Sequence, residues 1–266
     1  MGTESTDLTS AHWIAVDAGA TRIRVAPVQF MGMPRLLNGI LKRDFRSDQG
    51  PERVAQAMEL IREVARQQDW NPPYCLALAW AGAPTPDGRG IEQARYGPAI
   101  PDLVERLTRG LPIANRPVLQ SDARAALQGG VLRLRCRSAY ALISGSGLGE
   151  AYYSEGLCWS RQQFRQRFGS AAEFVWQDRD AESWLRTADW SGLDHPDPKH
   201  LQVLEALVAH RCSLEKPERI LLGGHFLRWF EEGRIPPRLG GIPVTYLEPD
   251  WALEGCCWLE MAPPRA

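Results

Sequence analysis

The chain has 266 residues, of which 44% are hydrophobic and 24% are charged, and its formal net charge at pH 7 is −1. This composition is typical of a globular protein with one large domain or two modest ones. The near-neutral charge gives no electrostatic reason to expect a nucleic-acid partner or an anionic membrane surface. No apolar run approaches the roughly 20 residues of a membrane span, so we also expect no membrane partner.

The N-terminal segment and the cysteines indicate the compartment. Residues 1–12 are polar and lack the apolar stretch of a secretory signal, so we expect a frayed tail. The six cysteines show no CxxC spacing, and without an export signal we expect reduced thiols in a cytoplasmic protein. Cys256 and Cys257 are adjacent on a predicted helix, which favours burial over metal binding.

Residues 13–28, WIAVDAGATRIRVAPV, predict a strand, a tight turn and a second strand. Asp17 ends the first strand and Gly19 lets the turn backbone approach a ligand closely. An aspartate at a strand tip can hold Mg²⁺ through water, while backbone N–H groups, Thr21 and Arg22 can face phosphate oxygens. The alternative is an ordinary hairpin whose glycine only permits the turn.

The next elements alternate between strands and helices. The sequence predicts a third strand at 36–43, an amphipathic helix at 51–68, a buried strand at 74–79 and a short helix at 101–109. Residues 81–90 form a Pro/Gly-rich loop after the buried strand. Ligands bind at such loops in open α/β sheets, although a plain connection explains the composition as well.

Asp122 lies between a short strand at 118–119 and a helix predicted at 123–134. An N-cap aspartate is sufficient to explain an acid at this position. A general base facing a bound hydroxyl is the functional alternative. Position in the sequence does not separate the two.

The second half repeats the organisation of the first. A strand at 138–143 enters the turn Ser144-Gly145-Ser146-Gly147-Leu148-Gly149, and the chain resumes as a strand at 151–153. Glycines also make simple bulges, but two such hairpins, each opening an α/β half, could clamp a polyphosphate. We further expect helices at 199–211 and 250–261, strands at 219–222 and 242–247, and a helix from His225 after the Gly223-Gly224 turn. Residues 164–198 show no regular pattern, and we expect their tryptophans to pack locally.

The ordered set of motifs resembles the ROK sugar kinases of the sugar kinase/Hsp70/actin superfamily. The motifs are DAGATRIR, PTPDGRG, SDARAAL, ISGSGLG and ILLGG, and they span about residues 13–261. A weaker similarity is to N-acetylglucosamine kinases and BadF-type ATPases. The resemblance implies an α/β fold of duplicated ribonuclease-H-like (actin/hexokinase-like) domains with an interdomain cleft. We place these domains at 13–137 and 138–266.

The resemblance also implies ATP- and Mg²⁺-dependent transfer of a phosphoryl group to a hydroxyl of a sugar-like small molecule. It implies roles for twelve residues. These are a catalytic base (Asp122), a first phosphate loop (Asp17, which would hold Mg²⁺ through water, with Gly19, Thr21 and Arg22), a second phosphate loop (Gly145, Ser146 and Gly147), an adenosine loop (Gly223 and Gly224) and acceptor-binding positions (Ser121 and Glu173).

Several positions depart from the family pattern. Arg22, Ser121, Trp176 and Glu150 stand where the family commonly has Lys, Asn, His and Gly. An acid at position 150 either repels phosphate or points away along its strand. The changed acceptor-binding positions predict an atypical acceptor, such as a modified sugar, an amino sugar or a cyclitol. The family's cysteine-rich zinc motif is absent, so we expect no structural zinc.

Two other functions are compatible with such a fold. One is a catalytically weak protein that senses a sugar or nucleotide, motivated by Ser121, Glu150 and Trp176. The other is a repressor with a DNA-binding region before the kinase-like domain. The first predicted strand begins at Trp13, which leaves no room for that region, so we set the repressor aside. A homodimer is the assembly that the family suggests.

Overall fold

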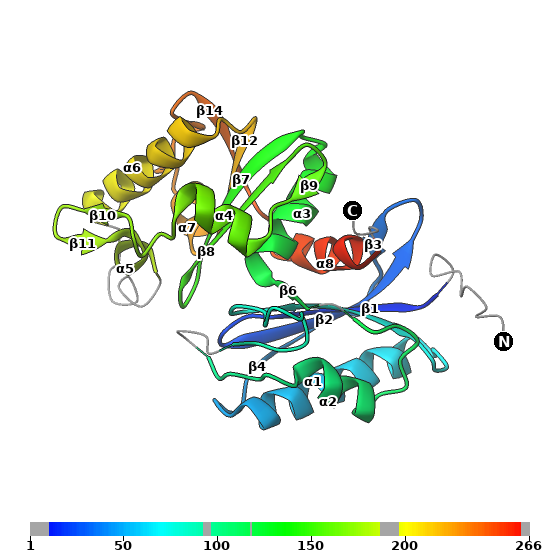
Figure 1. Ribbon diagram of the computed structural model, residues 1–266. Helices are drawn as coiled ribbons and strands as arrows, with labels where there is room; N and C mark the ends of the chain where they lie inside the picture. Colours follow the sequence, from blue (N-terminus) through cyan, green and yellow to red (C-terminus); the bar gives the residue numbers. More distant parts are fainter. Residues whose placement is uncertain (1–10, 93–96, 118, 187–196, 262–266) are drawn as a thin grey trace. The chain divides into compact units, whose positions relative to one another are not determined.

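The computed structural model describes residues 11–92, 97–117, 119–186 and 197–261. The chain forms two compact units (Figure 1). Unit 1 comprises two segments of the chain, one up to Ala125 and one from Ala252 onward, and unit 2 comprises Ala126–Trp251. The domain ranges 13–137 and 138–266 stay a prediction, and residues 1–10 of the expected tail lie outside the described residues. In the described part of the chain, no helix is long and apolar enough to cross a membrane.

Unit 1 is built on a six-stranded sheet in the order β3-β2-β1-β5-β6, with β4 paired to β2. Its strands are β1 (Trp13–Ala18), β2 (Arg22–Phe30), β3 (Pro34–Leu36), β4 (Leu41–Asp44), β5 (Cys75–Trp80) and β6 (Leu119–Ser121). Its helices are α1 (Gly50–Gln67), α2 (Leu103–Gly110), the first turn of α3 (Asp122–Leu134) and most of α8 (Trp251–Met261). Strand β1 is antiparallel to β2 and parallel to β5, which is parallel to β6.

The side chains of β1 point alternately to the two faces of this sheet. Ile14 and Val16 join the buried cluster that contains Leu60 and Ile61 of α1. Helices α1 and α2 cover the same face of the sheet (Figure 1). Asp17 belongs to the opposite set of β1 side chains, because successive side chains of a strand point to opposite faces.

The expectation of one strand at 36–43 is wrong. The structure has two short strands there, β3 and β4, which pair with different parts of β2. The chain between them passes through Gly39 with φ of +107°, a conformation that interrupts a regular strand.

Unit 2 repeats the topology of unit 1. Its sheet has the order β13-β14-β12-β7-β8-β9, in which β7 is antiparallel to β8 and parallel to β12, and β12 is parallel to β14. The strands are β7 (Ser138–Ser144), β8 (Leu148–Ser154), β9 (Leu157–Cys158), β12 (Arg219–Gly224), β13 (Arg238–Leu239) and β14 (Ile242–Tyr246). The predicted duplication of a hairpin followed by parallel strands is therefore confirmed.

Residues 161–185, most of which belong to the region 164–198 that showed no regular pattern in the sequence, contain four short elements. They are α4 (Arg161–Phe168), β10 (Val175–Trp176), β11 (Arg179–Asp180) and α5 (Ala181–Leu185). Helix α4 begins with a capping box, in which the Gln163 N–H donates to Ser160 Oγ at 3.2 Å and the Ser160 N–H donates to Gln163 Oε1 at 2.8 Å. The Ser-x-x-Gln spacing is the sequence signal that predicts this helix start. The remaining helices are α6 (Pro198–Leu214) and α7 (Phe226–Glu231).

The cysteines are free thiols, and five of the six are buried. Cys256 and Cys257 are both fully buried on α8, as predicted. Cys256 Sγ lies 3.2 Å from the Leu253 carbonyl oxygen of its own helix, so it behaves as a small core residue.

Candidate active site

In unit 1, the carboxyl ends of three neighbouring parallel strands bring the predicted site residues to one edge. Ala18 at the end of β1 lies opposite Trp80 of β5, and Trp80 lies opposite Ser121 of β6. Ligands bind at this edge in open α/β sheets. Asp17 and Asp122 are more than 100 residues apart in the sequence. At this edge they come close enough for the negative charge of Asp17 to act on Asp122.

Asp122 is half-buried at the start of α3, and it is not the residue that caps the helix. Ser121 has that role, because its Oγ accepts a 3.3 Å hydrogen bond from the N–H of Arg124. Asp122 Oδ1 accepts a 2.8 Å bond from the N–H of Ala123. Burial and, secondarily, the negative charge of Asp17 raise the pKa of Asp122 to about 6. A carboxylate with a pKa just below neutrality is suited to accept a proton from a bound hydroxyl.

Asp17 is only 6% exposed, and its charge is balanced within the hairpin. It lies opposite Arg24 in the β1–β2 register, and its Oδ2 accepts a 3.1 Å hydrogen bond from Arg24 Nε and a second bond from Arg24 Nη2. Mg²⁺ is usually held by one or two carboxylates together with substrate phosphates, and the two acids at this edge fit such a site. In the described segments, no three His, Cys, Asp or Glu side chains gather as a metal cluster. The Mg²⁺ role of Asp17 and the absence of zinc stay predictions.

The first predicted phosphate loop is a closed turn. The N–H of Gly19 donates to the Arg22 carbonyl at 2.8 Å. Arg53 of α1, 4% exposed, holds the turn from outside by donating to the Ala20 carbonyl at 2.8 Å. Thr21 is exposed, and Arg22 forms an exposed ion pair with Asp44 at 2.6 Å, which a bound phosphate can replace. The phosphate contacts themselves stay predictions.

In unit 2, the turns predicted as the second phosphate loop and the adenosine loop lie at the same sheet edge. Gly224 at the end of β12 is paired with Ser144 at the end of β7. Gly224 has φ of +70°, and a Cβ on it would lie 1.9 Å from the Ser144 carbonyl oxygen, so only glycine fits there. The N–H of His225 donates to the same oxygen at 3.0 Å.

The turn between β7 and β8 is accessible. The N–H of Gly145 donates to the Gly147 carbonyl at 2.9 Å, and Gly145, Ser146 and Gly147 are all half-exposed. A Cβ on Gly145 would meet nothing nearer than the Gly147 oxygen at 4.0 Å, so local packing does not require a glycine there. The phosphate contacts of this turn stay a prediction. Ser144 Oγ fixes the base of the turn by donating to the Leu185 carbonyl at 2.6 Å.

The predicted acceptor-binding residue of unit 2 lies in a turn after α4. Glu173 is exposed, and its Oε2 accepts a 3.2 Å hydrogen bond from the Ser170 N–H, which closes the turn. Trp176, which replaces the family's histidine, contacts Trp184 edge-to-face at a ring separation of 6.0 Å. Its indole belongs to the aromatic packing of unit 2. The acceptor contacts of Ser121 and Glu173 stay predictions.

Three arginines that were not predicted from the sequence bind residues in or next to the predicted loops, namely Arg24, Arg53 and Arg211. The hairpin register places Arg24 opposite Asp17, so pairing the two predicted strands would have found it. Arg53 and Arg211 carry no local sequence signal, because their partners lie in other elements.

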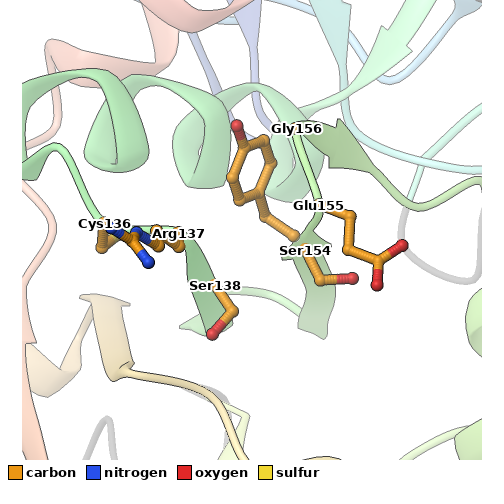
Figure 2. Close-up of a pocket in the computed structure, with 7 residues that line it drawn as sticks. Cys136, Arg137, Ser138, Ser154, Glu155 and Gly156 are labelled. Carbon is orange, nitrogen blue, oxygen red and sulfur yellow. The ribbon is translucent and has the colours of Figure 1, made fainter.

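A pocket of about 510 Å³ in unit 2 lies away from these turns. Its lining comes from the amino end of β7 and the carboxyl end of β8, including Ser138 and Ser154, whereas the glycine turn joins the opposite ends of these strands. Figure 2 shows the Glu155 carboxylate pointing away from Cys136 and Arg137. Ser138 Oγ and Ser154 Oγ already accept hydrogen bonds from Glu218 N–H and Trp159 Nε1. These contacts give the two hydroxyls structural roles.

No protein-family model matches the sequence, and no curated protein matches it in a sequence search. Solved structures match over nearly the whole chain. The inorganic polyphosphate/ATP-glucomannokinase from Arthrobacter sp. strain KM superposes with a TM-score of 0.75 at 18% identity, covering 93% of this chain and 97% of that one. The ROK family glucokinase from Streptomyces griseus, solved with glucose and AMPPNP, gives 0.67 at 18% identity, covering 94% and 99%.

A regulator shares the architecture too. A ROK family transcriptional regulator, a homologue of the E. coli MLC protein, superposes with a TM-score of 0.57 at 15% identity, and the match covers 94% of this chain and 80% of that one. Identities this low carry the fold and not the activity. The chain therefore has the hexokinase-like α/β fold of the ROK sugar kinases, as its motifs predicted.

Proposed function

We propose that this protein is an ATP-dependent kinase that transfers the γ-phosphoryl group to a hydroxyl of a sugar or sugar-like molecule. The fold shared with sugar kinases supports the reaction class. The observation that carries the proposal is the state of Asp122. Its neighbour Ser121 caps α3, Asp122 accepts a single hydrogen bond that the structure gives, from the Ala123 N–H, and its pKa is raised to about 6, so the carboxylate is suited to act as a base.

In this mechanism, an aspartate is the base and the glycine turns bind the nucleotide. Asp122 accepts the proton of the attacking hydroxyl. Backbone N–H groups of the Gly19–Arg22 turn and of the Gly145–Gly147 turn bind phosphate oxygens, and Gly223 and Gly224 receive the adenosine. Asp17 would hold Mg²⁺ through water. Mg²⁺ supplies charge neutralisation when it is bound with the nucleotide.

We propose an atypical acceptor because two acceptor-binding positions differ from the family pattern. Ser121 is shorter than the usual asparagine, and its Oγ is already used as a helix cap. Trp176 brings a bulky indole where a histidine is usual. A modified sugar, an amino sugar or a cyclitol suits such a site better than glucose. The free thiols support a cytoplasmic location, and a homodimer stays the expected assembly.

The alternative is a catalytically weak sensor of sugars or nucleotides. Ser121 and Trp176 favour it, and a ROK family transcriptional regulator is among the structures of similar fold. Glu150 no longer favours it, because its carboxylate is paired with Arg211.

Two measurements separate these functions. A ligand at about 100 times its Kd stabilises a protein by about 2.7 kcal/mol, so Mg·ATP is expected to raise the melting temperature of the kinase. ADP release across a panel of sugars, amino sugars and cyclitols then distinguishes them. Acceptor-dependent turnover supports the kinase, and ATP binding without turnover on the whole panel supports the sensor. Absence of any effect of Mg·ATP on melting contradicts the kinase.

A further inference from the structure

Glu150 is the first charged residue after the glycine turn, and it points away from it. It lies opposite Leu142 in the β7–β8 register, and Leu142 belongs to the buried cluster of unit 2. Residues directly opposite in an antiparallel pair share a face, so the Glu150 side chain enters the core. Its side chain is 6% exposed.

The Glu150 carboxylate accepts three hydrogen bonds. Arg211 of α6 binds it through two nitrogens, Nε to Oε1 at 3.0 Å and Nη2 to Oε2 at 3.3 Å, and Tyr140 Oη donates to Oε1 at 2.7 Å. A carboxylate in this state presents no free charge to the neighbouring turn. Burial and the charge of Glu150 raise the pKa of Tyr140 well above its usual value, so the phenol stays a donor.

Arg211 also reaches a second segment. Its Nη1 donates to the carbonyl of Phe168, the last residue of α4, and its guanidinium carbon lies 5.8 Å from the Phe168 ring centroid. Gly169 follows with φ of +71°, and the Ser170–Glu173 turn comes next. The Arg211 side chain is 2% exposed, so these bonds are shielded from water.

One buried guanidinium thus connects two parts of the proposed site. Glu150 lies three residues after Gly147 of the second phosphate loop, and Phe168 lies five residues before Glu173. A buried ion pair contributes little net stability compared with apolar residues, because desolvation offsets the attraction. A bidentate pair does fix the relative position of the elements that carry it.

We infer that the Glu150–Arg211 pair is a positioning device that holds the Ser144–Gly149 turn and the Gly169–Glu173 segment in fixed geometry. The roles of these segments toward nucleotide and acceptor rest on the proposed function. Glu150 stands where the resembling family commonly has glycine, so this ion pair is a departure of this chain from the family pattern. Glu150 and Arg211 are positioning residues that touch neither substrate.

The test uses the double variant Glu150→Gln/Arg211→Met, which removes both charges and leaves neither one buried alone. A matched control is Arg167→Met/Glu215→Gln, which removes an exposed ion pair between α4 and the residue after α6, at 2.9 Å. Tyr140→Phe, which deletes one hydrogen bond without a change of charge, serves as the milder second variant.

Amide hydrogen exchange is measured first, because it does not depend on kinase activity. In the double variant we expect exchange to quicken by roughly tenfold or more in 144–149 and 169–173, with β12 and α7 unchanged. Tyr140→Phe is expected to quicken amide exchange in 144–149 alone, and the control variant is expected to quicken it in neither segment. Unchanged exchange in both segments overturns the inference, and so does uniform quickening across unit 2, which would make the pair a general stabiliser.

Kinetics then test the link to the site. We expect the double variant to raise KM for ATP and for the acceptor by about tenfold each, with a smaller change in kcat. The single variant Arg211→Lys keeps the positive charge, so its KM values are expected to lie between those of the wild type and the double variant. Unchanged KM values contradict positioning of bound substrates. If the wild type neither binds nor turns over ATP, the proposed function fails, while the exchange result still decides the role of the pair.

Discussion

Arg24 lies opposite Asp17 across the β1–β2 hairpin and donates two hydrogen bonds to one of its carboxylate oxygens. Both side chains are largely buried, at 15% and 8% exposed. The pair therefore moderates the negative charge that Asp17 presents to Asp122.

Replacing Arg24 by Met is expected to move the acid limb of the pH–rate profile upward. The unbalanced charge of Asp17 raises the pKa of Asp122 further above 6, by about one unit. The profile of kcat/KM between pH 4.5 and 8.5 measures this shift. Arg43→Met, which breaks the half-exposed pair with Glu63, is the control and is expected to leave the limb in place. A limb that does not move in Arg24→Met contradicts the electrostatic link.

Asp122→Asn is expected to stabilise the protein above pH 6. Because the pKa of Asp122 is raised to about 6 in the folded state, from a usual value of 3.8, the folded protein binds the proton more tightly than the unfolded chain. The stability that this proton contributes is complete below pH 3.8 and is lost as the pH rises through 6. Urea unfolding at pH 8 is therefore expected to show a more stable variant, and at pH 3.5 no difference. A variant that is less stable at pH 8 would indicate that the carboxylate is structural.

Gly224→Ala is expected to destabilise the protein more than Gly233→Ala. Both glycines have positive φ, +70° and +68°, so both substitutions strain the backbone by about 1 kcal/mol. Only at Gly224 does the new Cβ meet an obstacle, the Ser144 carbonyl oxygen at 1.9 Å, and the backbone must shift by an amount that costs about 2 kcal/mol more. Urea unfolding of the two variants measures the difference directly. Equal losses of unfolding free energy in the two variants would mean that β12 can move away from β7 at no cost in stability.

Arg53→Met is expected to loosen the first phosphate loop. Arg53 donates to the Ala20 carbonyl at 2.8 Å and to the Ser47 carbonyl at 2.9 Å from a buried position, so its loss removes the donor from two half-buried residues. We expect a loss of about 2 kcal/mol in unfolding free energy and a several-fold rise in KM for Mg·ATP. Arg62→Met, which removes an exposed bond to the Gly110 carbonyl, is the matched control. An unchanged KM in Arg53→Met would separate this loop from nucleotide binding.

Much of this fold was predictable because its signals are local. The apolar runs at β1 and β5, the helical spacing of α1 and the repeated glycine turns predicted the duplicated α/β halves. The break between β3 and β4 was not predicted, although the dipeptide Asn38-Gly39 between them is a turn signal and Gly39 has a positive φ.

The site was predictable to a smaller extent. Strand ends located Asp17 and Asp122 at one edge, but sequence alone did not separate a capping acid from a base. That distinction depends on which oxygen receives the Arg124 N–H. The direction of Glu150 depends likewise on Arg211, which is 61 residues away in the sequence and has no local signal.

The central claim is that Asp122 accepts the proton of the acceptor hydroxyl. The most direct test is acceptor-dependent ADP release from Mg·ATP by the wild type and by Asp122→Asn. Asp102→Asn is the control, because Asp102 stands before α2 and its carboxylate contacts exposed Arg106 at 2.7 Å. We predict a loss in kcat of at least about 100-fold for Asp122→Asn, with ATP binding retained, and no loss for Asp102→Asn. Turnover that survives in Asp122→Asn would contradict the assignment of this residue as the base.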